Sequence, residues 1–264
     1  MDHKKYSLWF AATSLVLSIL ACNLGSPAAP QDTPATQAAT ESPASDGPPI
    51  SNAAAQEGCM NPYMPVIAGA SWNYNLQGSV PDTYTHTILS VDNDGFVEQD
   101  VFASGVTRQA EWKCESGNLT ALNPPGGTSG TVTTEGVEAN FQTTALEGVT
   151  VPAVINPGDT WTQSITLEGT ETINGLEIPA KNQFTSNCTA IVIESVTVPA
   201  GIFDALRVDC IIDMNITITM GGSDIQTPIN FTSSSWYALK VGLVKNVGTG
   251  SLDSTTELVS FTLP

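Results

Sequence analysis

The chain is poor in positive charge. Its 264 residues contain 8 Lys and Arg against 26 Asp and Glu, which gives a formal net charge of −18. A surface that follows nucleic-acid phosphates needs an excess of cations, so we expect no nucleic-acid partner. Only 13% of the residues are charged and 41% are hydrophobic. The chain is therefore too apolar for a disordered polyelectrolyte and has enough apolar material for a folded core.

Histidine is almost absent, and this limits the chemistry. His86 is the only histidine beyond the first 21 residues. A catalytic base needs a nucleophile and an orienting carboxylate, and the chain has no G-x-S-x-G motif. We therefore expect His86 to be a hydrogen-bonded residue on a strand. The Gly-rich stretch 123–130 is not followed by Lys-Ser/Thr or by a helix, so it predicts no phosphate site.

Paired carboxylates are the remaining route to catalysis, because a hydrolase can use two of them. The candidate pairs are Glu98/Asp100, Glu168/Glu171 and Asp209/Asp213. In so acidic a chain such pairs arise by chance, and we interpret them as solvated strand faces. The run 92–95 resembles half of a calcium loop, but Ala103 stands where the final Glu ligand belongs. We predict no catalytic, cofactor-binding or metal-binding residues, no cofactor, and no enzymatic activity.

The first 21 residues are typical of an export signal. Lys4 and Lys5 precede an apolar run over residues 8–21, which at 14 residues is too short to span a bilayer comfortably. Ile19-Leu20-Ala21 followed by Cys22 resembles the lipobox of bacterial lipoproteins. This resemblance implies cleavage before Cys22 and its acylation, for example with palmitate. The alternatives, an ordinary secretory signal or an uncleaved anchor helix, also export the chain.

Residues 22–56 read as a lipidated Cys followed by a tether. The stretch 25–55 has six prolines and no aromatic or basic residue. It can bury too little apolar surface to offset the entropy lost on folding, so we predict that it is disordered. At roughly 3.1 Å per residue, an extended tether could reach on the order of 100 Å. We predict that residues 57–264 form one extracytoplasmic domain, monomeric in itself, held on the cell membrane through Cys22.

The body has the alternating pattern of β-strands. Apolar and polar residues alternate over 161–168, 212–220 and 257–263, as in antiparallel sheets with one buried face. Turn sequences at 92–95, 174–175 and 221–224 separate neighbouring strands. We find no convincing amphipathic helix after the signal. The pattern predicts an all-β fold: a single strongly curved antiparallel sheet, or incomplete barrel, built from successive hairpins.

Two segments of the body echo each other. Residues 68–72 and 156–161 each run through a Gly-containing turn to a tryptophan, Trp72 or Trp161, that opens a long strand. The echo indicates two related sheet halves that share one core. We expect Trp72 and Trp161 in this core, and for Trp236 we favour core packing over an exposed position at a rim.

Four cysteines remain after Cys22, an even number in an exported chain. They predict two disulfides, for which three connectivities exist. A hairpin centred on Pro199 places Cys188 opposite Cys210, because each lies eleven residues from that centre. This favours Cys188–Cys210 and leaves Cys59–Cys114 to fix the start of the domain to the first sheet. Each disulfide would stabilise the fold by roughly 3 kcal/mol. The wide spacing of these cysteines argues against zinc.

Three segments together resemble a known family. They are 61–74, 196–208 with its Pro-Ala-Gly hairpin, and 236–245 with a Gly before the closing strand. They are similar to uncharacterised bacterial exported proteins, many of them lipoproteins, whose domain is a strongly curved antiparallel sheet. The resemblance implies no catalytic residues.

For residues 57–264 we consider two functions from different classes, and we favour both over a hydrolase. The first is a non-catalytic module that binds a cell-surface partner. The second is a carrier that holds a lipid or other small apolar ligand in the concave face of the sheet, where Met would suit an adaptable lining. The residues of this predicted face are Met214, Ile216, Ile218 and Met220.

Overall fold

The computed structural model describes residues 57–78, 81–123, 131–134, 137–250 and 253–264. The predicted signal, Cys22 and the tether lie outside these residues. One short 3-10 turn, η1 (Glu57–Cys59), precedes thirteen strands. The first seven are β1 (Ser71–Gly78), β2 (Asp82–Val91), β3 (Gly95–Phe102), β4 (Thr107–Glu115), β5 (Asn118–Ala121), β6 (Thr131–Thr134) and β7 (Val137–Gly148). The others are β8 (Thr160–Ile173), β9 (Leu176–Val198), β10 (Gly201–Met220), β11 (Ser223–Ala238), β12 (Gly242–Gly250) and β13 (Ser254–Thr262).

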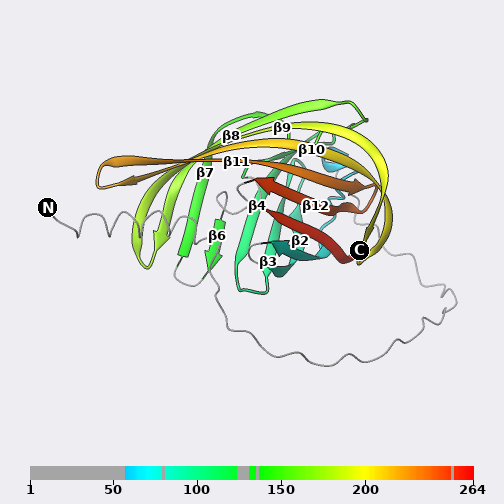
Figure 1. Ribbon diagram of the computed structural model, residues 1–264, viewed down its shortest axis with the longest axis horizontal. Coiled ribbons are helices and arrows are strands. Elements are labelled where there is room, and N and C mark those ends of the chain that lie inside the picture. Colours follow the sequence, from blue (N-terminus) through cyan, green and yellow to red (C-terminus); the bar gives the residue numbers. More distant parts are fainter. Residues whose placement is uncertain (1–56, 79–80, 124–130, 135–136, 251–252) are drawn as a thin grey trace, which may run out of the picture.

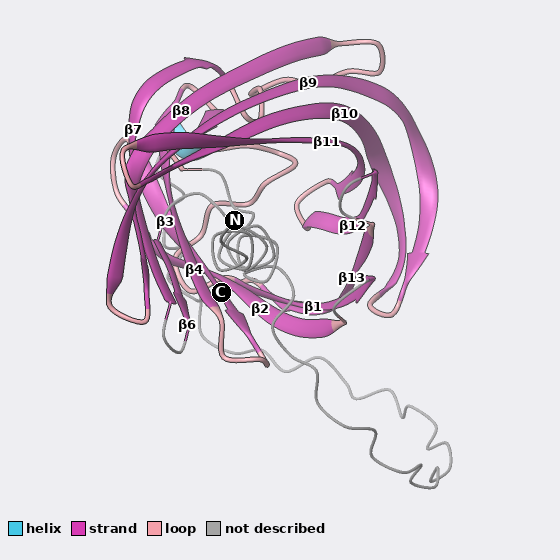
Figure 2. Cartoon of the chain, turned by 60° about the vertical axis from the view of Figure 1, so that its left-hand side comes forward, coloured by secondary structure: helices cyan, strands magenta, loops and turns pink. Residues whose placement is uncertain are grey.

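The strands form one antiparallel sheet that curves into a ring (Figures 1 and 2). Its order is β3-β2-β1-β13-β12-β11-β10-β9-β8-β7-β6-β4-β5, and β3 also pairs with β4. Every strand except β5 is therefore part of the ring. The ring is thinnest between β4 and β6, where three residue pairs join the strands. The predicted all-β fold, a strongly curved sheet or incomplete barrel, is confirmed.

The predicted turns lie between the strands that they were expected to join. Residues 92–94 connect β2 to β3, 174–175 connect β8 to β9, and 221–222 connect β10 to β11. The third predicted strand exists as β13, but a bulge at Val259 interrupts its alternation. Before the bulge Leu258 is buried, contrary to the prediction, and Val259 is exposed. After the bulge Phe261 faces Trp72, although it is 37% exposed, and Leu263 packs against the core as predicted.

Two hydrophobic clusters fill the inside of the sheet. The larger one includes Trp72, and Trp161 packs against it, as predicted. The smaller one joins β7, β8, β9 and β10, and it contains Met214, Ile216 and Ile218. Met220, the fourth residue of the predicted ligand face, is 36% exposed. The face proposed for an apolar ligand is thus largely packed against its own neighbouring strands.

Residues 57–70 cross one end of the ring. The Asn61 side-chain amide donates to the carbonyls of Gly117 (2.9 Å) and Pro152 (3.0 Å). On the other side, the Lys240 N–H donates to the Pro62 carbonyl. The segment therefore ties β4 and β5 to the β11–β12 turn, and the predicted tether would enter at this end.

Both disulfides form between the predicted partners. Cys59 in η1 bonds to Cys114 in β4, and Cys188 in β9 bonds to Cys210 in β10. The predicted hairpin centre is off by half a residue, because Gly201 faces Val198 and the turn is Pro199-Ala200. A one-residue bulge at Ile191 then shifts the register and brings Cys188 opposite Cys210.

The predicted echo is a repeat of the same backbone arrangement. Gly69 N–H donates to the Ile88 carbonyl (2.8 Å), and Gly158 N–H donates to the Ala190 carbonyl (2.7 Å). Both glycines have positive φ, 82° and 96°. Three residues later Trp72 and Trp161 stand at equivalent places.

The repeat extends across the following strands. One-residue bulges occur at equivalent places, at Leu89 in β2 and at Ile191 in β9. When the two bulges are aligned, each strand of the first half matches one strand of the second. The first half is β1-β2-β3-β4-β6-β7 and the second is β8-β9-β10-β11-β12-β13, so the ring consists of two related six-stranded halves.

Candidate functional site

A surface hollow lies on the outer face of β8, β9, β10 and β11, and we call it the β8–β11 depression. Its volume is about 780 Å³, within the usual range of ligand sites. It is lined by Thr160, Trp161, Thr162, Asn187, Cys188, Thr189, Ile191, Arg207, Asp209, Cys210, Ile211, Thr232, Ser233 and Ser234. Most of these point outward because they alternate with the core residues of the same strands.

A fixed charged pair forms part of this lining. Arg207 Nε and Nη2 donate to the two carboxylate oxygens of Asp209 at 2.8 and 2.9 Å. The guanidinium carbon also lies 5.6 Å from the centre of the Trp236 ring. Trp236 in turn donates from Nε1 to Glu194 at 2.7 Å. Two hydrogen bonds in a fork hold Arg207 in one orientation and balance its charge.

Neutral hydrogen-bonding groups and apolar side chains complete the surface. Thr162 Oγ1 donates to Asn187 Oδ1 at 2.9 Å across β8 and β9. Ile191 and Ile211 are exposed beside them, Ile211 by 58%. The depression therefore offers hydroxyls, an amide and hydrocarbon, with one internally neutralised ion pair.

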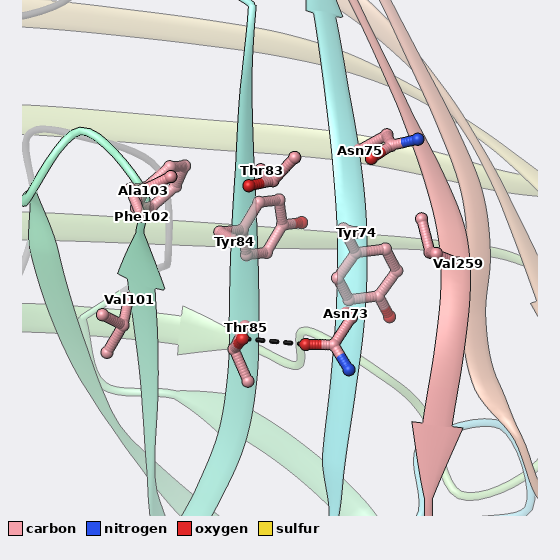
Figure 3. A pocket seen from close by; sticks show the side chains of 10 residues that line it. All are labelled: Asn73, Tyr74, Asn75, Thr83, Tyr84, Thr85, Val101, Phe102, Ala103 and Val259. Atoms are coloured by element: carbon pink, nitrogen blue, oxygen red, sulfur yellow. Dashed lines mark hydrogen bonds between the residues drawn. The ribbon is translucent and has the colours of Figure 1, made fainter. Parts of the chain in front are cut away.

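A smaller hollow of about 360 Å³ lies over β1, β2, β3 and β13 (Figure 3). Thr85 Oγ1 donates to Asn73 Oδ1 at 2.8 Å in its floor. Asn73 and Thr85 are the counterparts of Thr162 and Asn187 in the repeat, with the two residue types exchanged. The two hollows thus overlap when one half is placed on the other.

Inside the ring, His86 lies between two carboxylates. Its Nδ1 is 2.9 Å from Asp100 Oδ1, and its Nε2 is 3.6 Å from Glu98 Oε2. The Glu98 side chain is 4% exposed, Asp100 13% and His86 18%. The prediction that His86 is a hydrogen-bonded residue on a strand is confirmed. The interpretation of Glu98 and Asp100 as solvated is wrong, because both lie on the inner face of β3.

Burial and charge shift the pKa values of this cluster. Burial raises the pKa of Glu98 to about 7, although the neighbouring His86 acts against this shift. Burial alone would lower the pKa of His86, but the charges of Glu98 and Asp100 outweigh it and the pKa is raised. Both ring nitrogens of His86 face carboxylates, so neither is presented to a substrate as a base. The cluster is a poor catalytic centre despite its shifted pKa values.

The other two carboxylate pairs do not form a two-acid site. Glu168 is exposed and pairs with Lys181 at 2.8 Å, whereas Glu171 is buried and its pKa is raised by burial. Asp209 is engaged by Arg207, and Asp213 is exposed. Among the described residues, no group of three or more His, Cys, Asp or Glu side chains is arranged to hold a metal ion.

Sequence reasoning missed Arg207, Glu194 and Asn187 as a shared surface. The sequence did contain one indication of this surface. Arg207 and Asp209 are two residues apart, which places both on the same face of a strand. The pairing of β10 with β9 and β11, which brings the other residues to that face, required the register.

No helix in the described part of the chain is long and apolar enough to cross a membrane.

Comparisons with known proteins support the fold. Residues 132–262 match the model of the DUF3108-like family, and no curated protein matches the chain. A predicted lipoprotein from Parabacteroides distasonis has a similar structure, with a TM-score of 0.51 and 18% identity over 77% of this chain and 99% of its own. This likeness shows a shared fold.

Two further crystal structures are more distant. A predicted exported protein with a YmcC-like fold from Bacteroides fragilis has a TM-score of 0.47 and 17% identity, over 77% of this chain and all of its own. The hypothetical lipoprotein YmcC from Escherichia coli K12 has a TM-score of 0.35 and 9% identity, over 75% of this chain and 86% of its own.

Proposed function

We propose that the protein is a lipid-anchored, extracytoplasmic lipoprotein whose β domain is a non-catalytic binding module. Its binding surface is the β8–β11 depression. The observation that carries this proposal is the fixed surface there: Arg207 held by Asp209, Thr162 bonded to Asn187, and exposed Ile191 and Ile211 between them. A pre-arranged surface loses little side-chain entropy on binding.

Binding fits the interior of the domain better than catalysis or carriage does. His86 is enclosed by Glu98 and Asp100, and it presents no free ring nitrogen. Met214, Ile216 and Ile218 are engaged in the smaller hydrophobic cluster. A carrier function would require this cluster to open, whereas the outer depression is open as it stands.

The anchor is tested on the membrane fraction of cells that express the full chain. Mass spectrometry should find a mature N-terminus at an acylated Cys22. A mature chain that begins elsewhere contradicts the anchor but leaves the binding surface open to its own test.

The binding surface is tested by hydroxyl-radical footprinting of the mature C22S chain, with and without cell-envelope extract from the host. Oxidation of Ile191 and Ile211 should fall when the extract is present. Leu176 and Leu239 are exposed outside the depression and serve as internal controls. Equal protection of these controls, or no protection in the depression, would contradict the proposed surface.

A further inference from the structure

We infer that the ligand of the β8–β11 depression is a neutral saccharide chain, and that the hollow over β1, β2, β3 and β13 is a second site of the same chemistry. The inference rests on the proposed function, because it names the ligand of that binding surface.

The polar groups of the depression are mainly hydroxyls and amides. The outer face offers Thr160 and Thr162 from β8, Asn187 and Thr189 from β9, and Thr232 and Ser234 from β11. Hydroxyl and amide side chains each donate and accept hydrogen bonds. A saccharide presents the same mixture of donors and acceptors, spaced along a chain of hydroxyls.

The two charged side chains of the lining neutralise each other. Asp209 takes up both forked hydrogen bonds of Arg207, so no uncompensated cation remains in the lining for an anionic ligand. The chain as a whole has a net charge of −18, which repels polyanions. A neutral ligand suffers no such repulsion, whereas a phosphorylated or uronate-rich polymer would.

Apolar side chains lie within the polar surface. Ile191 and Ile211 are exposed among the hydroxyl groups. Sugar rings have apolar C–H faces as well as polar edges, and a lining of mixed character suits both.

The repeat supplies an independent observation. The first-half hollow contains Asn73, Thr85 and Val101, at the positions of Thr162, Asn187 and Ile211 (Figure 3). The hydrogen bond between amide and hydroxyl is retained, and the apolar position stays apolar. Where the second half has Arg207 and Asp209, the first half has Val97 and Gln99. The side chains that the two hollows have in common are thus uncharged.

The experiment uses the mature C22S chain in native gels that contain a polysaccharide. Dextran, starch, a β-1,3-glucan and a galactomannan are the neutral probes, and alginate and polygalacturonate are the anionic ones. At least one neutral polymer should retard the protein, and its oligosaccharide should titrate two sites by calorimetry. The double variant N187A/I211D should weaken binding about tenfold at one site, and T85A/V101D should remove the other. Thr197→Ala changes an exposed hydroxyl of β9 outside both hollows and should have no effect.

Unchanged thermal midpoints show that the variants are folded. Retardation by anionic polymers alone, or by none of the probes, overturns the saccharide assignment. Neutral binding that N187A/I211D leaves intact overturns the site, and a single site unaffected by T85A/V101D overturns the second one. If footprinting protects the depression while every neutral polymer fails, the binding surface stands and only the ligand class is wrong.

Discussion

Trp72 and Trp161 occupy the same place in the two halves of the ring. Each follows a turn whose glycine has positive φ, and each indole N–H donates to a backbone carbonyl, of Val241 (2.6 Å) or Thr150 (3.1 Å). The strand residue opposite differs: His86 faces Trp72, whereas Cys188 faces Trp161. One backbone arrangement therefore accommodates either a charged pair or a disulfide.

This equivalence predicts that the charged cluster can be replaced by its counterpart. His86, Asp100 and Glu98 correspond to Cys188, Cys210 and Val208. The triple variant H86C/E98V/D100C should form a third disulfide and unfold at a higher temperature, because it removes buried charge and cross-links two strands. Thiol titration and calorimetry measure the two effects.

The matched control is T87C/Q99C, the next facing pair on the same two strands. Neighbouring pairs of an antiparallel ladder alternate between close and wide Cα spacing, and disulfides favour the close pairs. Its thiols should remain titratable. Free thiols in the triple variant as well would contradict the repeat as a guide to local geometry.

The buried Glu98 should make the domain less stable at higher pH. Its folded-state pKa of about 7 lies above the ordinary 4.5, so the folded state binds the proton more tightly than the unfolded state. The free energy of unfolding should therefore fall as pH rises from about 4.5 to 7, by up to about 3 kcal/mol. The raised pKa of His86 adds a loss in the same direction above pH 6.5. Urea unfolding at pH 5 and pH 8 measures the difference.

Glu98→Gln should reduce this pH dependence, since the amide carries no charge at either pH. Glu177→Gln changes an exposed carboxyl of β9 and should leave the slope unchanged. A pH profile that is the same for E98Q and the unaltered protein would show that Glu98 does not titrate in this range.

The two disulfides should differ in their contribution to stability. Cys59–Cys114 closes a loop of 55 residues and Cys188–Cys210 one of 22. In the loop-entropy account, removing them costs about 4 and about 3 kcal/mol respectively. Chemical unfolding of C59S/C114S and C188S/C210S tests this order, and a larger loss for the second variant would contradict it.

Gly169 should be intolerant of any side chain. A Cβ at this position in β8 would collide with the backbone carbonyl of Asn140 in β7. Gly169→Ala should cost at least about 2 kcal/mol, because the two strands cannot separate without losing their pairing. Gly175→Ala in the β8–β9 turn serves as the control, with open space around its Cβ and a φ of 82°. Only the backbone penalty of about 1 kcal/mol applies there.

Much of the fold was predictable because strand period and turn chemistry are local. The period-two pattern over 161–168 identified a buried face that includes Gln163, and the turns at 174–175 and 221–222 fixed two hairpins. The bulge at Ile191 was not predictable, since it depends on how β9 pairs with β10. The bulge at Val259 was equally unpredictable, since it depends on how β13 pairs with β1 and places Leu258 on the buried face.

The candidate surface was harder to predict than the fold. Asp209 was visible as a carboxylate, but its partner Arg207 lies on the same strand and gave no motif. Glu98 was judged solvated because nothing local distinguishes an inward strand position in an acidic chain. Only the pairing of β2 with β3 shows that it shares a buried face with His86.

The pairing of β1 with β13 has a consequence for folding order. Ser71 faces Thr262, so strands from opposite ends of the domain must meet before the ring closes. Contacts so distant in sequence make folding slow and dependent on late events. A chain that crosses a membrane N-terminus first cannot form this pair until its last residues have emerged. Until then β1 and the strands that follow it carry an unpaired edge, which neighbouring unfinished chains could join.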